Sequence, residues 1–93
     1  MRERTGRSLP TIFDIFGYKI YFWSNEGNEP VHVHVSKGDP SPNATKIWVP
    51  ASGMPVLEHN NSGIPKRDLL RIMKYIAANR ADIYLEWHRF FER

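Results

Sequence analysis

The sequence predicts an α+β fold, in which a three- to four-stranded antiparallel sheet is followed by two C-terminal helices packed on one face. Segments in the first two thirds of the chain alternate apolar with polar residues, most clearly in Val31-His32-Val33-His34-Val35. From Pro65 onward, apolar residues recur instead at helical spacing. A chain of 93 residues is also too short for two independent hydrophobic cores.

The composition is typical of one globular domain, with 41% hydrophobic, 13% aromatic and 25% charged residues. The chain has no cysteine, which excludes disulfides and thiolate metal sites and agrees with a reducing compartment. No apolar stretch approaches the roughly 20 residues that span a bilayer, and no signal-peptide pattern follows the first arginines. We therefore expect a cytoplasmic protein that has no membrane partner.

The N-terminal segment differs from the rest of the chain. Residues 1–9 contain three arginines and almost nothing to bury, so we predict a flexible basic tail there and a single α+β domain over 10–93. The net charge of +3 permits attraction to nucleic acid or to acidic partners without requiring either. Because a domain of this size buries only about 60 to 65% of its unfolded surface, a homodimer is a reasonable expectation.

The first strands are expected between Thr11 and Ser24, where Ile, Phe, Tyr and Trp are concentrated. Gly17 divides this segment, and we expect a short strand before it and a longer strand after it. The polar Gly- and Pro-containing segment 25–30 then predicts a turn or short loop. The strand 31–35 follows, with its three valines on one face and its two histidines on the other.

Two more β segments are predicted before the helices. The segment 38–43 is rich in Pro, Asn, Asp and Gly, which is typical of a loop. Residues 45–49 again alternate, with isoleucine and valine on one side and lysine and tryptophan on the other. Residues 54–59 can form a fourth, shorter strand.

The C-terminal part predicts two amphipathic helices. Pro65 suits a first-turn position, and apolar residues continue at helical spacing through Ala78. Asn79 is a capping residue with the carboxylate of Asp82 three positions later, which indicates that a second helix begins there. One long helix over residues 66–92 is the alternative.

His32 and His34 are the candidate catalytic or metal-binding residues. They project from the same side of a strand, about 6.5 to 7 Å apart along it. They could act as general acid and base in phosphodiester cleavage, because imidazole titrates near neutrality, or they could bind a divalent metal. A dependable zinc site needs a third ligand, and the candidates stand at no diagnostic spacing: His59, His88, Asp39, Glu58 and Glu86. A half-exposed strand with a polar outer face is the structural alternative, and nothing in the sequence requires a cofactor.

The sheet face that carries the histidines is a candidate binding surface. If the valines face the helices, the opposite face is aromatic and basic, with Lys19, Tyr21, Trp23, Lys46 and Trp48. Aromatic platforms interleaved with cations bind unpaired nucleotides, and the alternatives are cross-strand aromatic pairing or a dimer contact. On the first helix, Arg67, Arg71 and Lys74 share one stripe, which either faces solvent or contacts phosphate or an acidic partner.

Motifs along most of the chain from Pro10 onward resemble a known family. They are Pro10-Thr11-Ile12, Phe16-Gly17, Ile20-Tyr21-Phe22, the His-x-His strand, Ile64-Pro65-Lys66-Arg67-Asp68-Leu69 and Glu86-Trp87. This pattern resembles the small bacterial and archaeal family called domain of unknown function 4160. The resemblance implies a prokaryotic, cytoplasmic setting and neighbours of the small regulatory or toxin–antitoxin type, but no established activity.

Two departures from that family concern the histidine strand. Family members often have another histidine in the loop before this strand, where this chain has residues 26–29, and Val31 stands in place of a proline. The resemblance therefore implies that a third ligand or catalytic partner is missing. We predict a small binding or regulatory module, associated with a toxin–antitoxin-like system, that contacts nucleic acid or a small regulatory protein through the His/Trp/Lys face. The alternative is a small hydrolase or nuclease that uses His32 and His34, with or without a divalent metal.

Overall fold

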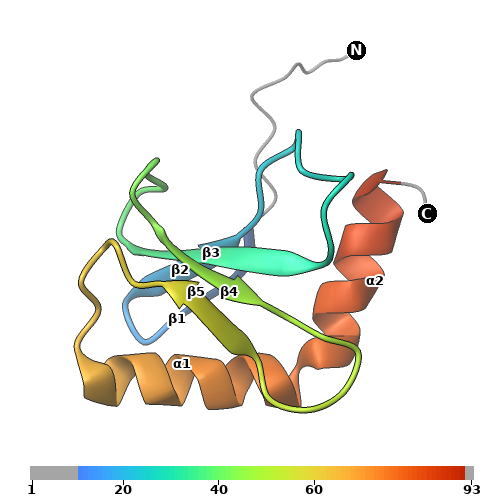
Figure 1. Ribbon diagram of the computed structural model, residues 1–93. Coiled ribbons are helices and arrows are strands. Elements are labelled where there is room, and N and C mark those ends of the chain that lie inside the picture. The colour runs from blue at the N-terminus through green and yellow to red at the C-terminus, as the bar shows by residue number, and fades with distance from the viewer. Residues whose placement is uncertain (1–10, 92–93) are drawn as a thin grey trace.

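The strands form where apolar and polar residues alternate. In the computed structural model, which describes residues 11–91, they are β1 (Thr11–Ile15), β2 (Tyr18–Tyr21), β3 (His32–Lys37), β4 (Thr45–Trp48) and β5 (Val56–His59). The strands pair in sequence order, each antiparallel to the next. Helices α1 (Lys66–Ala78) and α2 (Arg80–Phe91) follow, which confirms the α+β class (Figure 1).

The sheet has five strands, so the predicted count of three or four was wrong. The short strand expected before Gly17 does form, and it pairs with β2 as a fifth strand of the same sheet. The turn between them consists of Phe16 and Gly17, whose φ angles are both positive, at 55° and 82°. Two such residues give the turn type whose twist matches that of the strands on either side, and β1 therefore joins the sheet directly.

The hydrophobic core lies between the sheet and α1, which covers one face of the sheet (Figure 1). Strands β2, β3 and β4 supply Ile20, Val33, Val35 and Ile47, the residue after β4 supplies Val49, and the helices supply Leu69, Ile72, Ile76 and Ile83, all of them buried. The valines of β3 face this core, as the alternation predicts. Full burial of one such side chain contributes about 1.5 to 3 kcal/mol, so this layer is the main source of stability and fixes the orientation of β3.

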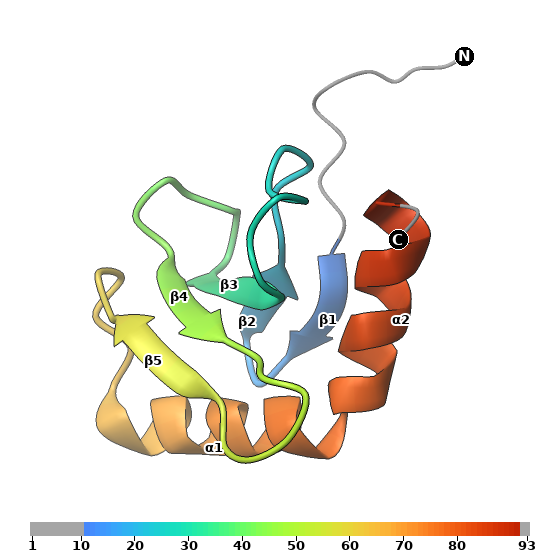
Figure 2. The ribbon, with the colours of Figure 1, turned by 45° about the vertical axis from the view of Figure 1, so that its right-hand side comes forward.

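The helical segment breaks at Asn79, as the capping pattern predicts. Asn79 leaves helical geometry, with φ −112° and ψ 25°, and its side-chain amide donates to the Tyr75 carbonyl at 2.9 Å. Its own carbonyl accepts the N–H groups of Asp82 and Ile83 at the start of α2. The chain therefore turns, and α2 stands beside β1 at the end of the sheet (Figure 2). Only α1 lies flat on the sheet face (Figure 1), so the prediction that both helices pack on one face was wrong for α2.

Two sequence predictions concern other parts of the molecule. No helix in the described part of the chain is long and apolar enough to cross a membrane. The predicted basic tail, residues 1–9, lies outside the residues that the structure describes.

Candidate metal centre

The face of the sheet opposite α1 is covered at β2 and β3 by two loops. Tyr21 and His32 have no exposed surface, and His34 is only 9% exposed. The Tyr21 hydroxyl contacts the backbone of Ser41 in the loop after β3, while Glu26 in the loop before β3 contacts both histidines. The half-exposed strand with a polar outer face is therefore not what the structure shows for β3.

Two consecutive turns in the loop before β3 direct Glu26 toward the sheet. The Glu26 N–H donates to the Trp23 carbonyl at 3.3 Å, and the Glu29 N–H donates to the Glu26 carbonyl at 3.1 Å. The Trp23 N–H in turn donates to Glu26 Oε1 at 2.9 Å. These contacts hold the carboxylate over β3 with only 13% of the side chain exposed.

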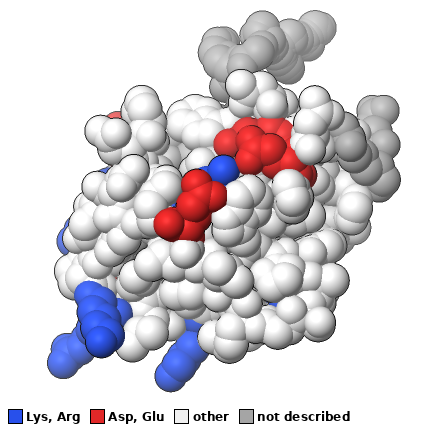
Figure 3. Space-filling view, in the orientation of Figure 1, with Lys and Arg blue, Asp and Glu red and all other residues white. Residues whose placement is uncertain are grey.

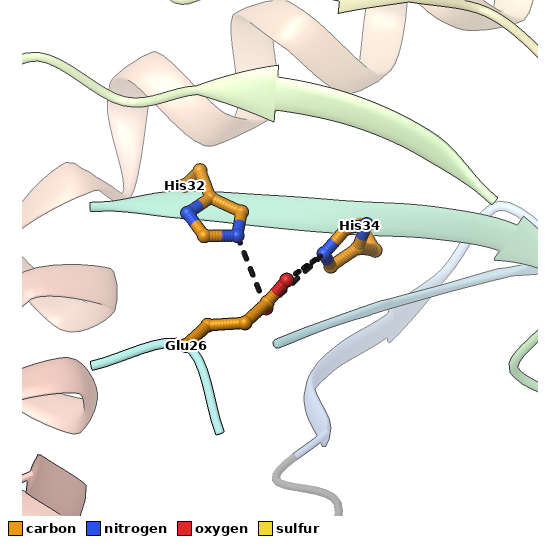
Figure 4. A group of neighbouring side chains, drawn as sticks. All are labelled: Glu26, His32 and His34. Carbon is orange, nitrogen blue, oxygen red and sulfur yellow. Dashed lines mark hydrogen bonds and ion pairs between the residues drawn. The ribbon is translucent and has the colours of Figure 1, made fainter. Parts of the chain in front are cut away.

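Glu26, His32 and His34 converge on one point (Figure 4). His34 Nε2 lies 2.9 Å from Glu26 Oε2 and 3.1 Å from Oε1, and His32 Nε2 lies 3.0 Å from Oε1. One ligand atom from each residue can be chosen so that all three lie within 4.8 Å of one another. Glu26 is thus the third polar partner that the family resemblance implied to be missing, and the prediction of its absence was wrong.

The backbone fixes the tautomer of His32. Its Nδ1 lies 2.9 Å from the Pro30 carbonyl, and because a carbonyl only accepts, Nδ1 must carry the hydrogen. A neutral His32 therefore presents a lone pair at Nε2. That atom is buried and has no hydrogen-bond partner within residues 11–91, since the contact with Glu26 Oε1 has an ion-pair distance but not hydrogen-bond geometry. A lone pair and a carboxylate oxygen repel each other, so this contact is stable when a proton or a metal ion lies between Nε2 and Oε1.

The ionisation of Glu26 increases the negative charge at this point. Burial alone raises the pKa of Glu26, but the contacts with His32 and His34 and the Trp23 N–H outweigh it, and the resulting pKa lies well below its ordinary value. The carboxylate therefore remains ionised throughout the ordinary pH range. A fixed negative charge beside two imidazoles attracts a proton or a metal ion.

The surface around the site is not basic, which contradicts the prediction of a basic sheet face. Lys46 lies 3.1 Å from Glu29 and 3.8 Å from Glu58, and its ammonium lies 4.4 Å from the Trp48 ring centroid. Figure 3 shows acidic side chains on either side of a basic one in the upper middle of the molecule. Lys19 is paired with Asp14 at 2.9 Å. The carboxylates therefore offset the lysines that the alternation placed here.

The predicted aromatic residues surround the histidines. The Trp48 ring centroid lies 5.2 Å from that of His32, and the Tyr21 and Trp23 centroids lie 5.8 Å and 6.3 Å from that of His34. Trp87 from α2 adds a contact with His32 at 5.3 Å, and the sequence indicated it only as a core or interface residue. Arg67, Arg71 and Lys74 lie on α1 and form no contact with this site.

The donor set fits a transition-metal ion. Two imidazole nitrogens and one carboxylate oxygen are ligands of zinc and related ions, whose bonds to them are about 2.0 to 2.2 Å long. Ligand atoms around such a tetrahedral ion stand roughly 3.3 Å apart. Glu26 Oε1 lies 3.0 Å from His32 Nε2 and 3.1 Å from His34 Nε2, and one ligand atom from each residue lies within 4.8 Å of the others. The Pro30 carbonyl that orients His32 is a typical outer partner of a metal-binding histidine.

Gly27 is expected to be essential for the position of Glu26. A Cβ atom at Gly27 would lie 2.6 Å from Cδ1 of Phe91, so Gly27→Ala must displace either the loop or the Phe91 ring. We expect a loss of about 1 to 3 kcal/mol in the free energy of unfolding, measured by urea denaturation, and weaker metal binding.

Phe91→Ala provides the matched background for this test, because it removes the clashing ring. Gly27→Ala should then have a smaller effect on stability, and Asn25→Ala, at an exposed position of the same loop, should have little effect in either background. An equal loss with and without the Phe91 ring would contradict the packing argument.

The comparisons with known proteins give one match. A family model described as "Domain of unknown function (DUF4160)" matches residues 17–88. This range runs from the β1–β2 turn into α2 and includes all three residues of the candidate metal centre. No curated protein and no solved structure matches the chain.

Proposed function

The chain belongs to the DUF4160 family of domains of unknown function, and we propose that it is a metal-binding domain in which Glu26, His32 and His34 hold one divalent transition-metal ion. The observation that carries this proposal is the buried Nε2 of His32, which has no hydrogen-bond partner among the described residues and faces an ionised carboxylate at 3.0 Å. A buried polar atom without a partner destabilises a folded protein by about 1 to 3 kcal/mol. A metal ion at this position would satisfy His32, His34 and Glu26 together.

The ligand types favour one class of ion. Imidazole nitrogen suits zinc, iron, copper and nickel, whereas magnesium and calcium prefer sites built from oxygen atoms. His32 and His34 supply two nitrogens and Glu26 supplies the only carboxylate in the cluster. We therefore expect zinc or a related first-row ion, and we expect magnesium and calcium to bind weakly.

A small hydrolase or nuclease is the second candidate function. Catalytic zinc sites typically use three protein ligands and leave a position for water or substrate, and the described residues supply three ligands here. The side chains of Glu26 and His34 are 13% and 11% exposed, whereas that of His32 is fully buried. A coordination position open to water or substrate would therefore lie on the side of Glu26 and His34. A metal bound there would supply a Lewis acid and a water of lowered pKa.

The other sequence predictions remain predictions. They are a regulatory role in a toxin–antitoxin-like system, contact of the His/Trp/Lys face with nucleic acid or a regulatory protein, and a homodimer. The acidic pairs around Lys46 support a cation-binding role for this face better than a phosphate-binding role.

The metal proposal is tested by calorimetric titration of the purified chain with zinc, after treatment with a chelator. We expect one ion to bind per chain, and we expect Glu26→Gln to weaken binding by at least about tenfold because it removes the charged ligand while keeping the side-chain shape. The matched control is Glu29→Gln, three residues away, where the carboxylate contacts Lys46 and lies outside the cluster.

Absence of zinc binding, or an equal loss in both glutamine variants, would overturn the metal proposal. The hydrolase candidate needs a further result, namely cleavage of a phosphodiester or ester by the zinc-loaded chain that Glu26→Gln abolishes. If the zinc-loaded chain cleaves neither the phosphodiester nor the ester, hydrolase activity on these two classes of substrate is excluded.

A further inference from the structure

The exposed side of α1 carries four cations that form no ion pair with a carboxylate in the described part of the chain. They are Lys66, Arg67, Arg71 and Lys74, and none of them forms an ion pair with any residue from 11 to 91. The only acidic residue of α1 is Asp68, which accepts the Tyr18 hydroxyl at 2.8 Å. Lys and Arg side chains project from the lower edge of the molecule near α1, away from the acidic cluster (Figure 3).

Three of these cations follow one line along the helix. Arg67, Arg71 and Lys74 stand at positions i, i+4 and i+7, which places them on one side of α1 over about 10 Å. A line of cations of this length can contact neighbouring phosphates of one nucleic-acid strand. Arginine guanidinium groups can also bind phosphate oxygens in pairs.

An exposed aromatic ring lies beside this line of cations. Phe16 is 44% exposed, and the guanidinium carbon of Arg71 lies 4.0 Å from its ring centroid. Phe16 has a φ of 55°, which is unusual for a bulky residue, and turns of this type favour Asn, Asp or Gly at the position. Its contact with Tyr75, at 6.0 Å between centroids, leaves much of the ring accessible. The conformation of the β1–β2 turn therefore does not account for a phenylalanine at position 16.

We propose that Phe16, Arg67, Arg71 and Lys74 form a basic patch that binds single-stranded nucleic acid, with phosphates on the cations and a base against Phe16. Cations next to a solvent-accessible aromatic ring provide the two contacts that such strands need. A protein partner would instead require an apolar interface centre, and among the described residues of α1 and the β1–β2 turn, Phe16 and Leu70 are the only exposed large hydrophobic ones. The patch lies across the sheet from the metal centre and does not depend on it.

The proposal is tested by fluorescence anisotropy with a labelled oligothymidine of about 20 nucleotides, at roughly 50 to 200 mM salt. We expect Arg67→Gln/Arg71→Gln/Lys74→Gln to weaken binding by at least about tenfold at the lowest salt. Each lost phosphate contact should also reduce the slope of log affinity against log salt by about 0.7, or roughly 2 in total. The matched control, Lys19→Gln/Lys37→Gln/Arg89→Gln, removes the same charge from other elements and should retain most of the affinity.

Phe16→Asn separates base stacking from charge. Asn is a preferred residue at this position of the turn, so we expect the variant to fold normally, with an unchanged salt slope and an affinity about tenfold lower. The proposal is overturned if the wild-type chain does not bind the oligonucleotide, or if the control triple variant loses as much affinity as the patch variant. Equally tight binding of a polyglutamate peptide would assign the patch to acidic proteins and would also overturn it.

Discussion

His32→Asn is expected to abolish zinc binding while the domain remains folded. An asparagine amide N–H can donate to the Pro30 carbonyl in place of Nδ1, which lies 2.9 Å from it, but asparagine has no nitrogen at the position of Nε2. We expect zinc affinity to fall by at least about 100-fold, because a metal ligand is lost rather than one of its outer partners. Calorimetry and zinc-dependent thermal unfolding measure this effect.

The stabilisation expected from zinc binding can be stated in advance. An ion that binds only the folded chain stabilises it by about 4 kcal/mol when its concentration is 1,000 times the dissociation constant, and His32→Asn should remove most of this. His59→Asn is the matched control, because His59 lies on β5 outside the cluster. If His32→Asn bound zinc as tightly as the wild type, His32 would not be a ligand.

Trp87→Ala should have the largest effect on stability. Trp87 is only 2% exposed, and its ring centroid lies 4.9 Å from that of Phe22, 4.8 Å from that of Phe91 and 5.3 Å from that of His32. Removing a buried aromatic side chain typically destabilises a protein by about 3 to 5 kcal/mol. A domain of this size has about 5 to 15 kcal/mol in total, so the variant should be largely or wholly destabilised in urea denaturation.

Two further variants make the Trp87 prediction decisive. Trp87→Phe keeps an aromatic ring and should lose less stability than Trp87→Ala, so it remains measurable if the alanine variant fails to fold. Leu85→Ala lies on the same helix but at an exposed position, and it should cost less than about 0.5 kcal/mol. A loss below 1 kcal/mol for Trp87→Ala would show that the contacts of the Trp87 ring with Phe22, Phe91 and His32 contribute little to stability.

The sequence allowed most of the fold to be predicted because the deciding signals are local. The alternation over β3 depends on neighbouring residues, and so does the capping pattern at Asn79 that divides the helices. The predicted number of strands was wrong because the sequence of the β1–β2 turn is unusual. Phe16 occupies a turn position that favours Asn or Gly, so the sequence marked Gly17 as a break without showing that β1 pairs with β2.

The site was predicted only in part, for a different physical reason. His32 and His34 share a strand, and a period of two places them on one side. Glu26 reaches them through a loop, and loop conformations follow no period that would assign a side chain to a face. The same limitation applies to Glu29. It also lies in this loop, and its ion pair with Lys46 offsets one of the positive charges predicted for the sheet face. Trp87 carries only a helical core signal, which does not show that it also contacts His32.

The sequential order of the strands has a consequence for how the chain folds. Each strand pairs with its neighbour in sequence, and closing a short loop has a smaller entropy cost than closing a long one. All three residues of the candidate metal centre lie on β3 or in the loop between β2 and β3, so closure of this single hairpin is enough to bring them together. Low contact order favours rapid folding, and an ion held by this hairpin would stabilise it early, so that zinc would increase the folding rate as well as slow unfolding.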